Sequence, residues 1–153
     1  MRRFLIVSTL TLAVCGSFAS RAEAQIGPVC LQPLPFADNT FDIVLASGVM
    51  QYIQHAGLTL AELRRVTQKY VLVSRLPTWK YQDSQIVVQH LHGAWGEEQY
   101  PLHVFNRHRL EDLFEQAGFA VLWRDYGSEC FTLLGDREPV AHILYLLRKA
   151  CLF

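Results

Sequence analysis

Blocks of apolar residues separated by turn residues predict alternating strands and helices in the first half of the chain. Residues 41–46 form a short apolar run between turn residues, which is typical of a strand buried on both faces. Thr59 and Glu62 have the spacing of a capping box, and apolar residues follow at helical spacing, so we expect a helix near residues 58–68. Residues 70–74 read as a second buried strand. Strand, helix and strand in this order indicate a parallel α/β sheet.

The middle of the chain has no clear periodicity. Residues 76–105 mix apolar, aromatic and polar side chains, and we interpret them as a long loop or a covering element. A short element is possible at residues 85–91, although its type is left open.

The last third of the chain predicts one helix and two strands. Asn106 is a good N-cap, apolar residues recur at helical spacing, and Gly118 stands where a helix over residues 107–117 would end. Residues 119–123 and 140–147 read as strands with no helix between them. Consecutive strands of this kind predict an antiparallel hairpin at the edge of an otherwise parallel sheet, and thus an α/β fold.

The first 24 residues have the order of a secretory signal peptide. Arg2 and Arg3 precede an apolar run over residues 4–19, and Ala-Glu-Ala at residues 22–24 supplies a small-residue cleavage site. The alternative is that part of this run is a buried strand. We therefore divide the chain into a leader, residues 1–24, and a domain, residues 25–153. Cleavage would predict a secreted or periplasmic protein, whereas an enzyme that uses a cytosolic cofactor would be cytoplasmic.

Composition and charge exclude some classes of partner. The chain carries 14 lysines and arginines against 14 aspartates and glutamates, so it lacks the basic surface that nucleic acids require. Hydrophobic residues make up 51% and charged residues 18%, an ordinary globular balance. The four cysteines are widely scattered and predict neither a zinc site nor a disulfide framework.

Histidines offer one candidate for chemistry. His90, His92, His103 and His108 lie within a short stretch, but no carboxylate or cysteine stands at a ligand spacing, so we expect no metal site. His103 has the better claim as an acid, a base or a group that orients a substrate, and it is our only catalytic candidate. Tyr52 and Arg75 each follow a predicted strand, where they either face a ligand or are simply solvated.

Several segments resemble class I S-adenosylmethionine (SAM)-dependent methyltransferases. The sequence LPFADNTFDIV at residues 34–44 is similar to the segment that leads into the fourth strand of that family, and AELRRV at residues 61–66 is similar to the helix that follows it. SGVMQYI at residues 47–53 and YPLH at residues 100–103 resemble a bacterial group of methyltransferase-like proteins without a defined substrate. The resemblance covers the C-terminal half of the family's domain and implies a partial Rossmann-like fold.

The resemblance also implies a cofactor, an acceptor and a set of site residues. It implies SAM as the cofactor and a small molecule as the methyl acceptor; the identity of any protein partner is left open. By analogy with the family, Ala46 and Ser47 would lie near the cofactor. Gln51, Tyr52 and Tyr100 would face the acceptor, as would His103.

Two departures from the family pattern concern the cofactor. The sequence contains no G-x-G, although the family needs a glycine-rich turn after its first strand. Cys30, four positions before Leu34, replaces the acidic residue that often contacts adenine in the family. We therefore expect that the chain is the C-terminal portion of a methyltransferase that acts on a small-molecule acceptor, and that it is inactive as written. The alternatives are a non-catalytic remnant that binds a ligand or partner, and a small exported protein of methyltransferase ancestry.

Overall fold

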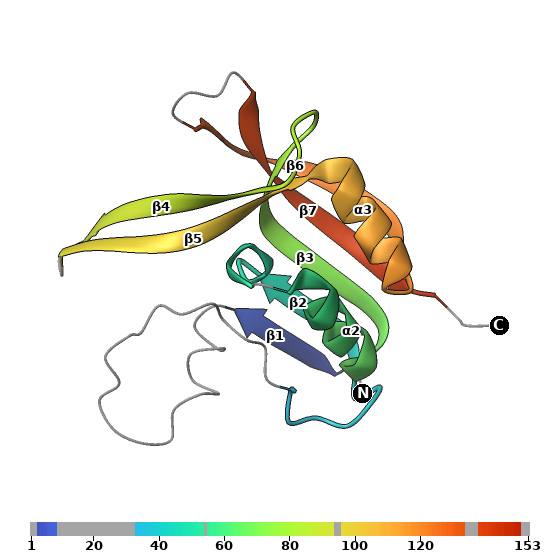
Figure 1. Cartoon of the computed structure of the whole chain (residues 1–153). Coiled ribbons are helices and arrows are strands. Elements are labelled where there is room, and N and C mark those ends of the chain that lie inside the picture. Colours follow the sequence, from blue (N-terminus) through green and yellow to red (C-terminus); the bar gives the residue numbers. More distant parts are fainter. Residues whose placement is uncertain (1–2, 9–32, 54, 94–95, 134–137, 151–153) are drawn as a thin grey trace.

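The computed structural model describes residues 3–8, 33–53, 55–93, 96–133 and 138–150, and for some strand residues only the backbone. The central sheet contains β1 (Phe4–Ser8), β2 (Phe41–Ser47), β3 (Thr67–Trp79), β7 (Pro139–Lys149) and β6 (Phe119–Thr132), in that spatial order. The first three strands are parallel, and β7 is antiparallel to both of its neighbours. This arrangement confirms the α/β fold with an antiparallel hairpin at one edge (Figure 1).

Strand β1 falls within the predicted leader. Its five residues pair in parallel register with β2, from Phe4 opposite Ile43 to Ser8 opposite Ser47. The backbone N–H of Arg3 also donates to the Asp42 carboxylate at 3.0 Å. Residues 9–32, which contain most of the leader, lie outside the described residues. Whether the leader is cleaved stays a prediction.

The interpretation of residues 76–105 as a long loop was wrong, although the short element left open at residues 85–91 is present as part of a strand. Strand β3 continues to Trp79, and β4 (Gln85–Gly93) and β5 (Gly96–Asn106) form an antiparallel hairpin that projects from the sheet as an arm (Figure 1). The arm joins the sheet at its base, where Thr78 and Trp79 of β3 pair in parallel with the end of β5. Strand β3 therefore exchanges its neighbour, β2, for β5 along the same edge.

Among the described residues, two helices and one 3-10 turn complete the fold. Helix α2 (Ala56–Val66) follows the 3-10 turn η1 (Met50–Tyr52) and leads into β3, and α3 (Arg107–Gln116) leads from β5 into β6. The Asn106 side chain accepts hydrogen bonds from the backbone N–H groups of His108 and Arg109, which confirms it as the N-cap. Gly118 has φ +78°, the left-handed conformation expected just beyond a helix end.

The prediction that Thr59 and Glu62 form a capping box at the start of a helix was wrong. Helix α2 begins three residues before Thr59, at Ala56, and no side chain caps it. The Thr59 hydroxyl donates to the His55 carbonyl oxygen, and the Glu62 carboxylate is engaged with Leu34 and Arg65. At the other end of α2, the Lys149 ammonium donates to the carbonyl oxygens of Arg64 and Thr67, which offsets the unpaired carbonyls there.

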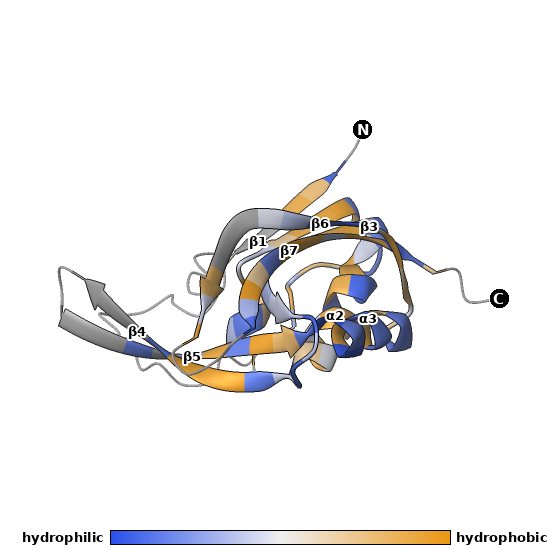
Figure 2. Cartoon of the chain, turned by 90° about the horizontal axis from the view of Figure 1, so that it is seen from above, coloured by the Kyte–Doolittle hydropathy of each residue, from blue (hydrophilic) through white to orange (hydrophobic). Residues whose placement is uncertain are grey.

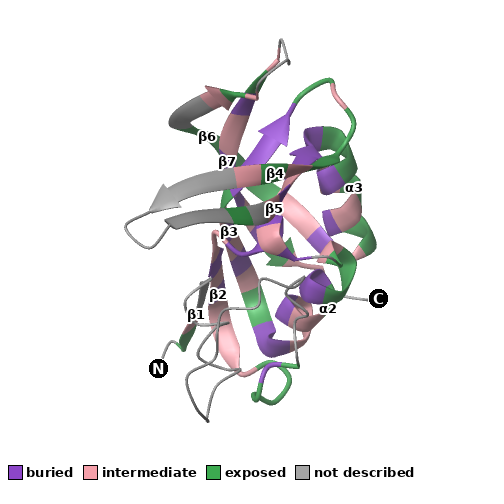
Figure 3. Ribbon diagram, turned by 60° about the vertical axis from the view of Figure 1, so that its left-hand side comes forward, coloured by how far each residue is buried: buried purple, intermediate pink, exposed green. Residues whose placement is uncertain are grey.

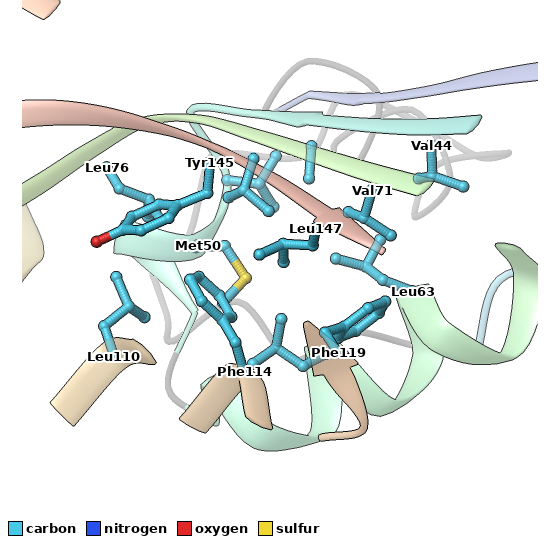
Figure 4. Close-up of a cluster of buried hydrophobic side chains, with 14 of the residues drawn as sticks. Val44, Met50, Leu63, Val71, Leu76, Leu110, Phe114, Phe119, Tyr145 and Leu147 are labelled. Carbon is cyan, nitrogen blue, oxygen red and sulfur yellow. The ribbon is translucent and has the colours of Figure 1, made fainter. Parts of the chain in front are cut away.

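The main core lies between the sheet and the two helices, which cover the same face (Figures 2 and 3). Its largest fully buried side chains include Met50, Phe114 and Tyr145, with the Phe114 and Tyr145 rings 5.1 Å apart (Figure 4). A smaller cluster, formed by Trp79, Leu102, Val104 and Val140, lies at the base of the arm. Neither described helix is long and apolar enough to cross a membrane.

The expectation that β2 and β3 are buried on both faces was wrong, because the face of the sheet opposite the helices is only partly buried. No described helix covers that face. Leu45, Leu72 and Leu146 are paired across β2, β3 and β7 and are only partly buried, and Trp123 on β6 is 51% exposed. The strands are therefore fully buried only on the side that packs against α2 and α3.

Candidate functional site

The carboxyl ends of β1, β2 and β3 meet at one edge of the sheet, where ligands bind in open α/β folds. Ser8, Ser47 and Ser74 stand opposite one another in register across the three strands. The Ser74 hydroxyl donates to the Ser47 hydroxyl oxygen at 3.0 Å. Sequence reasoning identified Ser47 and missed Ser74, although the signal was available, because Ser74, like Ser47, ends a predicted parallel strand.

A left-handed glycine turns the chain away from β2 at this edge. Gly48 has φ +63°, a conformation that other residues adopt only with strain. Its backbone N–H donates to the Ser74 carbonyl oxygen at 3.1 Å, which holds the turn against β3. A Cβ atom at Gly48 would lie 3.7 Å from the Gln51 side-chain nitrogen, so the turn and Gln51 are in direct contact.

Gln51 places a buried amide beside this turn. It is the middle residue of η1 and is only 6% exposed, and its side-chain oxygen Oε1 has no hydrogen-bond partner. Such an unsatisfied buried acceptor costs about 1–3 kcal/mol, so a donor from a ligand would be stabilising here. Ala46, in contrast, is 1% exposed with its methyl group in the main core, which leaves only its backbone for a ligand.

Arg75 marks the position where β3 changes its neighbour. Ser74 is the last residue of β3 paired with β2, and Thr78 is the first paired with β5. Between them, the pairing of β3 with β7 shifts register, and Arg75 has φ +61°. Its exposed side chain reaches the glycine turn, with Cδ 4.0 Å from the position of a Cβ atom on Gly48. A non-glycine residue in this conformation stores strain at the edge of the site.

Tyr52 and His103 lie on the side of the site that faces the arm. η1 packs against β5, and Tyr52 is partly buried against the smaller cluster. His103 on β5 is half-buried, with its ring centroid 5.9 Å from that of Phe105, and burial lowers the pKa of its imidazole below the usual 6.5. No described contact joins His103 to Gln51 or Ser47. The side chain of Tyr100, on the same strand, lies outside the described residues.

Metal ligands do not gather in the described part of the chain. No group of three or more histidines, cysteines, aspartates or glutamates comes together among these residues. His103 lies on β5 and His108 on α3, while the side chains of His90 and His92 are outside the described set.

The residues at this edge fit one side of a SAM site and do not fit the other. The Gly48 turn, the serine hydroxyls and the Gln51 amide offer backbone space and polar partners at the end of β2. The segment after β1 reads Thr-Leu-Thr-Leu and has no glycine before Gly16. Only glycine allows the backbone to approach a bound ligand closely in such a turn, so the sequence of this segment does not match the cofactor turn that the resemblance implies.

A family model and several solved structures match this chain. The model for the methyltransferase domain matches residues 8–72, less than half of the sequence. No curated protein matches the sequence.

Three solved structures have the same fold at low identity. A candidate SAM-dependent methyltransferase from Listeria monocytogenes has a TM-score of 0.60 and 11% identity, covering 98% of this chain and 81% of its own. A SAM-dependent methyltransferase from Methanosarcina mazei has a TM-score of 0.57 and 14% identity, covering 78% and 64%. The 1,6-didemethyltoxoflavin N1-methyltransferase of Burkholderia thailandensis, with its substrate and S-adenosylhomocysteine bound, has a TM-score of 0.54 and 12% identity, covering 80% and 50%.

These likenesses establish the fold of this chain as that of class I SAM-dependent methyltransferases. The cofactor of those proteins is SAM, and one of them holds the demethylated product S-adenosylhomocysteine. The chain spans about two thirds of the Methanosarcina protein and half of the Burkholderia enzyme.

Proposed function

We propose that this protein holds the acceptor side of a SAM-dependent methyl-transfer site, that the acceptor is a small molecule, and that the chain as written does not complete the reaction. The match to the methyltransferase domain and the shared fold support the reaction class. The small-molecule acceptor bound to the Burkholderia enzyme supports the substrate class. The absence of any G-x-G from the sequence supports the loss of turnover.

The observation that carries this proposal is the buried, unpaired Oε1 of Gln51. A protein that needed Gln51 only for packing would use an apolar side chain of similar size, because an unsatisfied amide oxygen is costly. The position of Gln51 beside the left-handed turn at Gly48, at the carboxyl end of a parallel strand, is where this fold class binds ligands.

The neighbouring residues position a ligand. Gly48 has no side chain, so a ligand can approach the backbone of the turn closely. The hydrogen-bonded hydroxyls of Ser47 and Ser74 provide polar groups beside it. Methyl transfer depends chiefly on the alignment of the reacting atoms, so positioning groups of this kind supply much of the catalysis. The lowered pKa of His103 keeps its imidazole neutral near pH 7, the form that accepts a proton from an acceptor molecule.

A titration with S-adenosylhomocysteine tests the proposal. In ¹⁵N NMR spectra of the full chain, we expect the amide signals of Ser47, Gly48 and Gln51 to shift without saturation, with a Kd weaker than about 1 mM. The Gln51→Met variant should lose the shifts, because it removes the amide and keeps the volume. Gln116→Met, at the exposed end of α3, is the matched control.

The outcomes separate the parts of the proposal. Tight, saturable binding with transfer of a labelled methyl group from SAM would show that the chain is a working enzyme, and the loss of turnover would be wrong. Shifts confined to residues elsewhere would remove the site at Gly48 and Gln51. A complete lack of response at this edge would favour the second candidate, a non-catalytic remnant that binds another ligand, which the missing glycine turn also supports.

A further inference from the structure

A hollow lies at the end of β3, where this strand pairs with β7. Its volume is about 360 Å³, and its walls come from the end of β3, the first residue of α3, the middle of β6 and the start of β7. The residues that matter for its chemistry are Trp79, Lys80, Arg107, Tyr126 and Glu138. No residue of the candidate methyl-transfer site lines it.

Arg107 is the most unusual residue of this wall. It is only 9% exposed, and its Nε atom is buried without a hydrogen-bond partner. The guanidinium carbon lies 5.4 Å from the centroid of the Tyr126 ring, a cation–π contact. Within the described part of the chain, no carboxylate forms an ion pair with it. An unpaired buried cation is costly, so an anion that binds in the hollow beside Arg107 would offset this cost.

The nearby carboxylates are already engaged. Glu138, which lines the hollow, accepts hydrogen bonds from the backbone N–H groups of Lys80, Tyr81 and Gln82, the last two at 3.0 and 3.1 Å. Glu111, one turn after Arg107 on α3, accepts from the Arg124 guanidinium at 2.7 Å. Neither carboxylate therefore serves as the counter-ion of Arg107.

The amino end of α3 does not by itself explain an anion site. Its exposed N–H groups are capped, because the Asn106 side chain accepts from the N–H groups of His108 and Arg109 at 3.0 and 3.1 Å. The charge available to a ligand is the Arg107 guanidinium, with Lys80 at the rim. Apart from Thr78 and the engaged carboxylate of Glu138, the rest of the wall is apolar or aromatic, which suits a flat ring.

We propose that this hollow binds a small single-ring molecule that carries one anionic oxyacid group, with the anion on Arg107 and the ring against the exposed ring of Tyr126. The shared chemistry is that of an aromatic carboxylate or phosphate. The volume matches a single ring, at the lower end of the range for small-molecule sites. The proposal is independent of the methyl-transfer function, because the site needs neither SAM nor any residue of the other edge.

Benzoate, benzamide and phenyl phosphate are the probes, used with the full chain in the absence of SAM. The readout is the indole N–H signal of Trp79 in ¹⁵N NMR spectra, since this group is fixed by donation to the Asp83 carbonyl oxygen at 3.0 Å. Benzoate or phenyl phosphate should shift this signal and saturate, and the tighter of the two identifies the anion. Benzamide, which has the same shape without the charge, should bind at least about tenfold more weakly.

Two arginine variants separate the hollow from general surface charge. Arg107→Met keeps the length of the side chain and should weaken binding of the anionic probe at least about tenfold. Arg109→Met removes an exposed cation two residues further along α3 and should leave binding unchanged. The proposal is overturned if both anions fail to shift the Trp79 signal, if benzamide binds as tightly as benzoate, or if the two variants behave alike. The comparison of benzoate with benzamide uses only the unmodified protein, so it decides the question even if Arg107→Met does not fold.

Discussion

The Glu62 carboxylate on α2 accepts a hydrogen bond from the backbone N–H of Leu34 at 2.7 Å, which fastens the loop before β2 to the helix after it. Arg65 completes the tie, donating to the Leu34 carbonyl oxygen at 3.0 Å and to Glu62 at 2.6 Å. The side chain of Leu34 is 9% exposed and belongs to the main core. The LPF segment and the ELRR segment, which resemble the methyltransferase family separately, are therefore two parts of one contact.

This contact predicts a dependence of stability on pH. Hydrogen bonds from Arg65 and Leu34 lower the pKa of Glu62 below its usual 4.5. The carboxylate thus contributes fully above pH 4.5, and its contribution is lost as the pH falls through the lowered value. We expect Glu62→Gln to reduce the free energy of unfolding by about 1 kcal/mol at neutral pH.

Urea denaturation at a series of pH values measures this effect. The difference between Glu62→Gln and the unmodified protein should shrink as the pH falls below 4.5. Glu115→Gln, at an exposed position of α3, controls for the loss of one carboxylate. A difference that stays constant down to the acid end of the series would contradict the assignment.

Two glycines should respond to alanine with opposite signs. Gly57 lies inside α2, where the nearest atom to a new Cβ, on Leu113, is 4.0 Å away, so Gly57→Ala should stabilise the protein by about 0.5–1 kcal/mol. Gly118 has φ +78°, and a new Cβ would lie 2.6 Å from Nε of Arg64. Gly118→Ala should therefore destabilise by about 1 kcal/mol or more. Thermal unfolding of both variants measures the pair, and shifts of the same sign would show that backbone conformation does not decide them.

The strain at Arg75 is also measurable. Its φ of +61° costs a non-glycine residue about 1 kcal/mol, and its side chain is exposed. We therefore expect Arg75→Gly to leave the free energy of unfolding unchanged or to raise it by up to that amount. Arg75→Ala removes the same side chain and keeps the strain, which makes it the control. If the two variants have equal unfolding free energies, the left-handed conformation carries no cost in this chain.

Removal of residues 1–24 tests the place of β1. Leu5 packs against the main core, and β1 forms a five-residue parallel ladder with β2, so deletion should lower the free energy of unfolding by about 2 kcal/mol or more. We propose that the strand is kept and that the protein is cytoplasmic. Mass spectrometry of the native protein provides the second measurement: a mature chain that starts at Gln25 and is as stable as the full chain would favour export instead.

The sequence predicted the elements whose signals are local. β2, the start of β3, and α3 between Asn106 and Gly118 were correct because apolar runs and caps act over a few residues. The arm was missed because β4 exposes apolar side chains such as Ile86 and Val88, at 62% and 58%, and so shows no alternation of apolar and polar positions. The capping box predicted at Thr59 and Glu62 was wrong because the Glu62 carboxylate binds the loop before β2 and not the end of the helix.

The candidate sites were predicted only in part, for a similar reason. Ser47 and Gln51 could be placed near a strand end from the resemblance, but the burial and missing partner of the Gln51 amide depend on how η1 packs. Arg107 follows an N-cap, and no sequence pattern singles it out. In the structure it is 9% exposed and its guanidinium lies over the ring of Tyr126, a residue distant in sequence.

The order of strands has a consequence for the newly made chain. β7 lies between β3 and β6, yet it follows both of them in the sequence. During synthesis, β3 and β6 therefore emerge with unpaired edges facing a gap that only later residues fill. The nascent chain should therefore be prone to aggregation, and should need chaperones, for as long as residues 139–149 have not been translated.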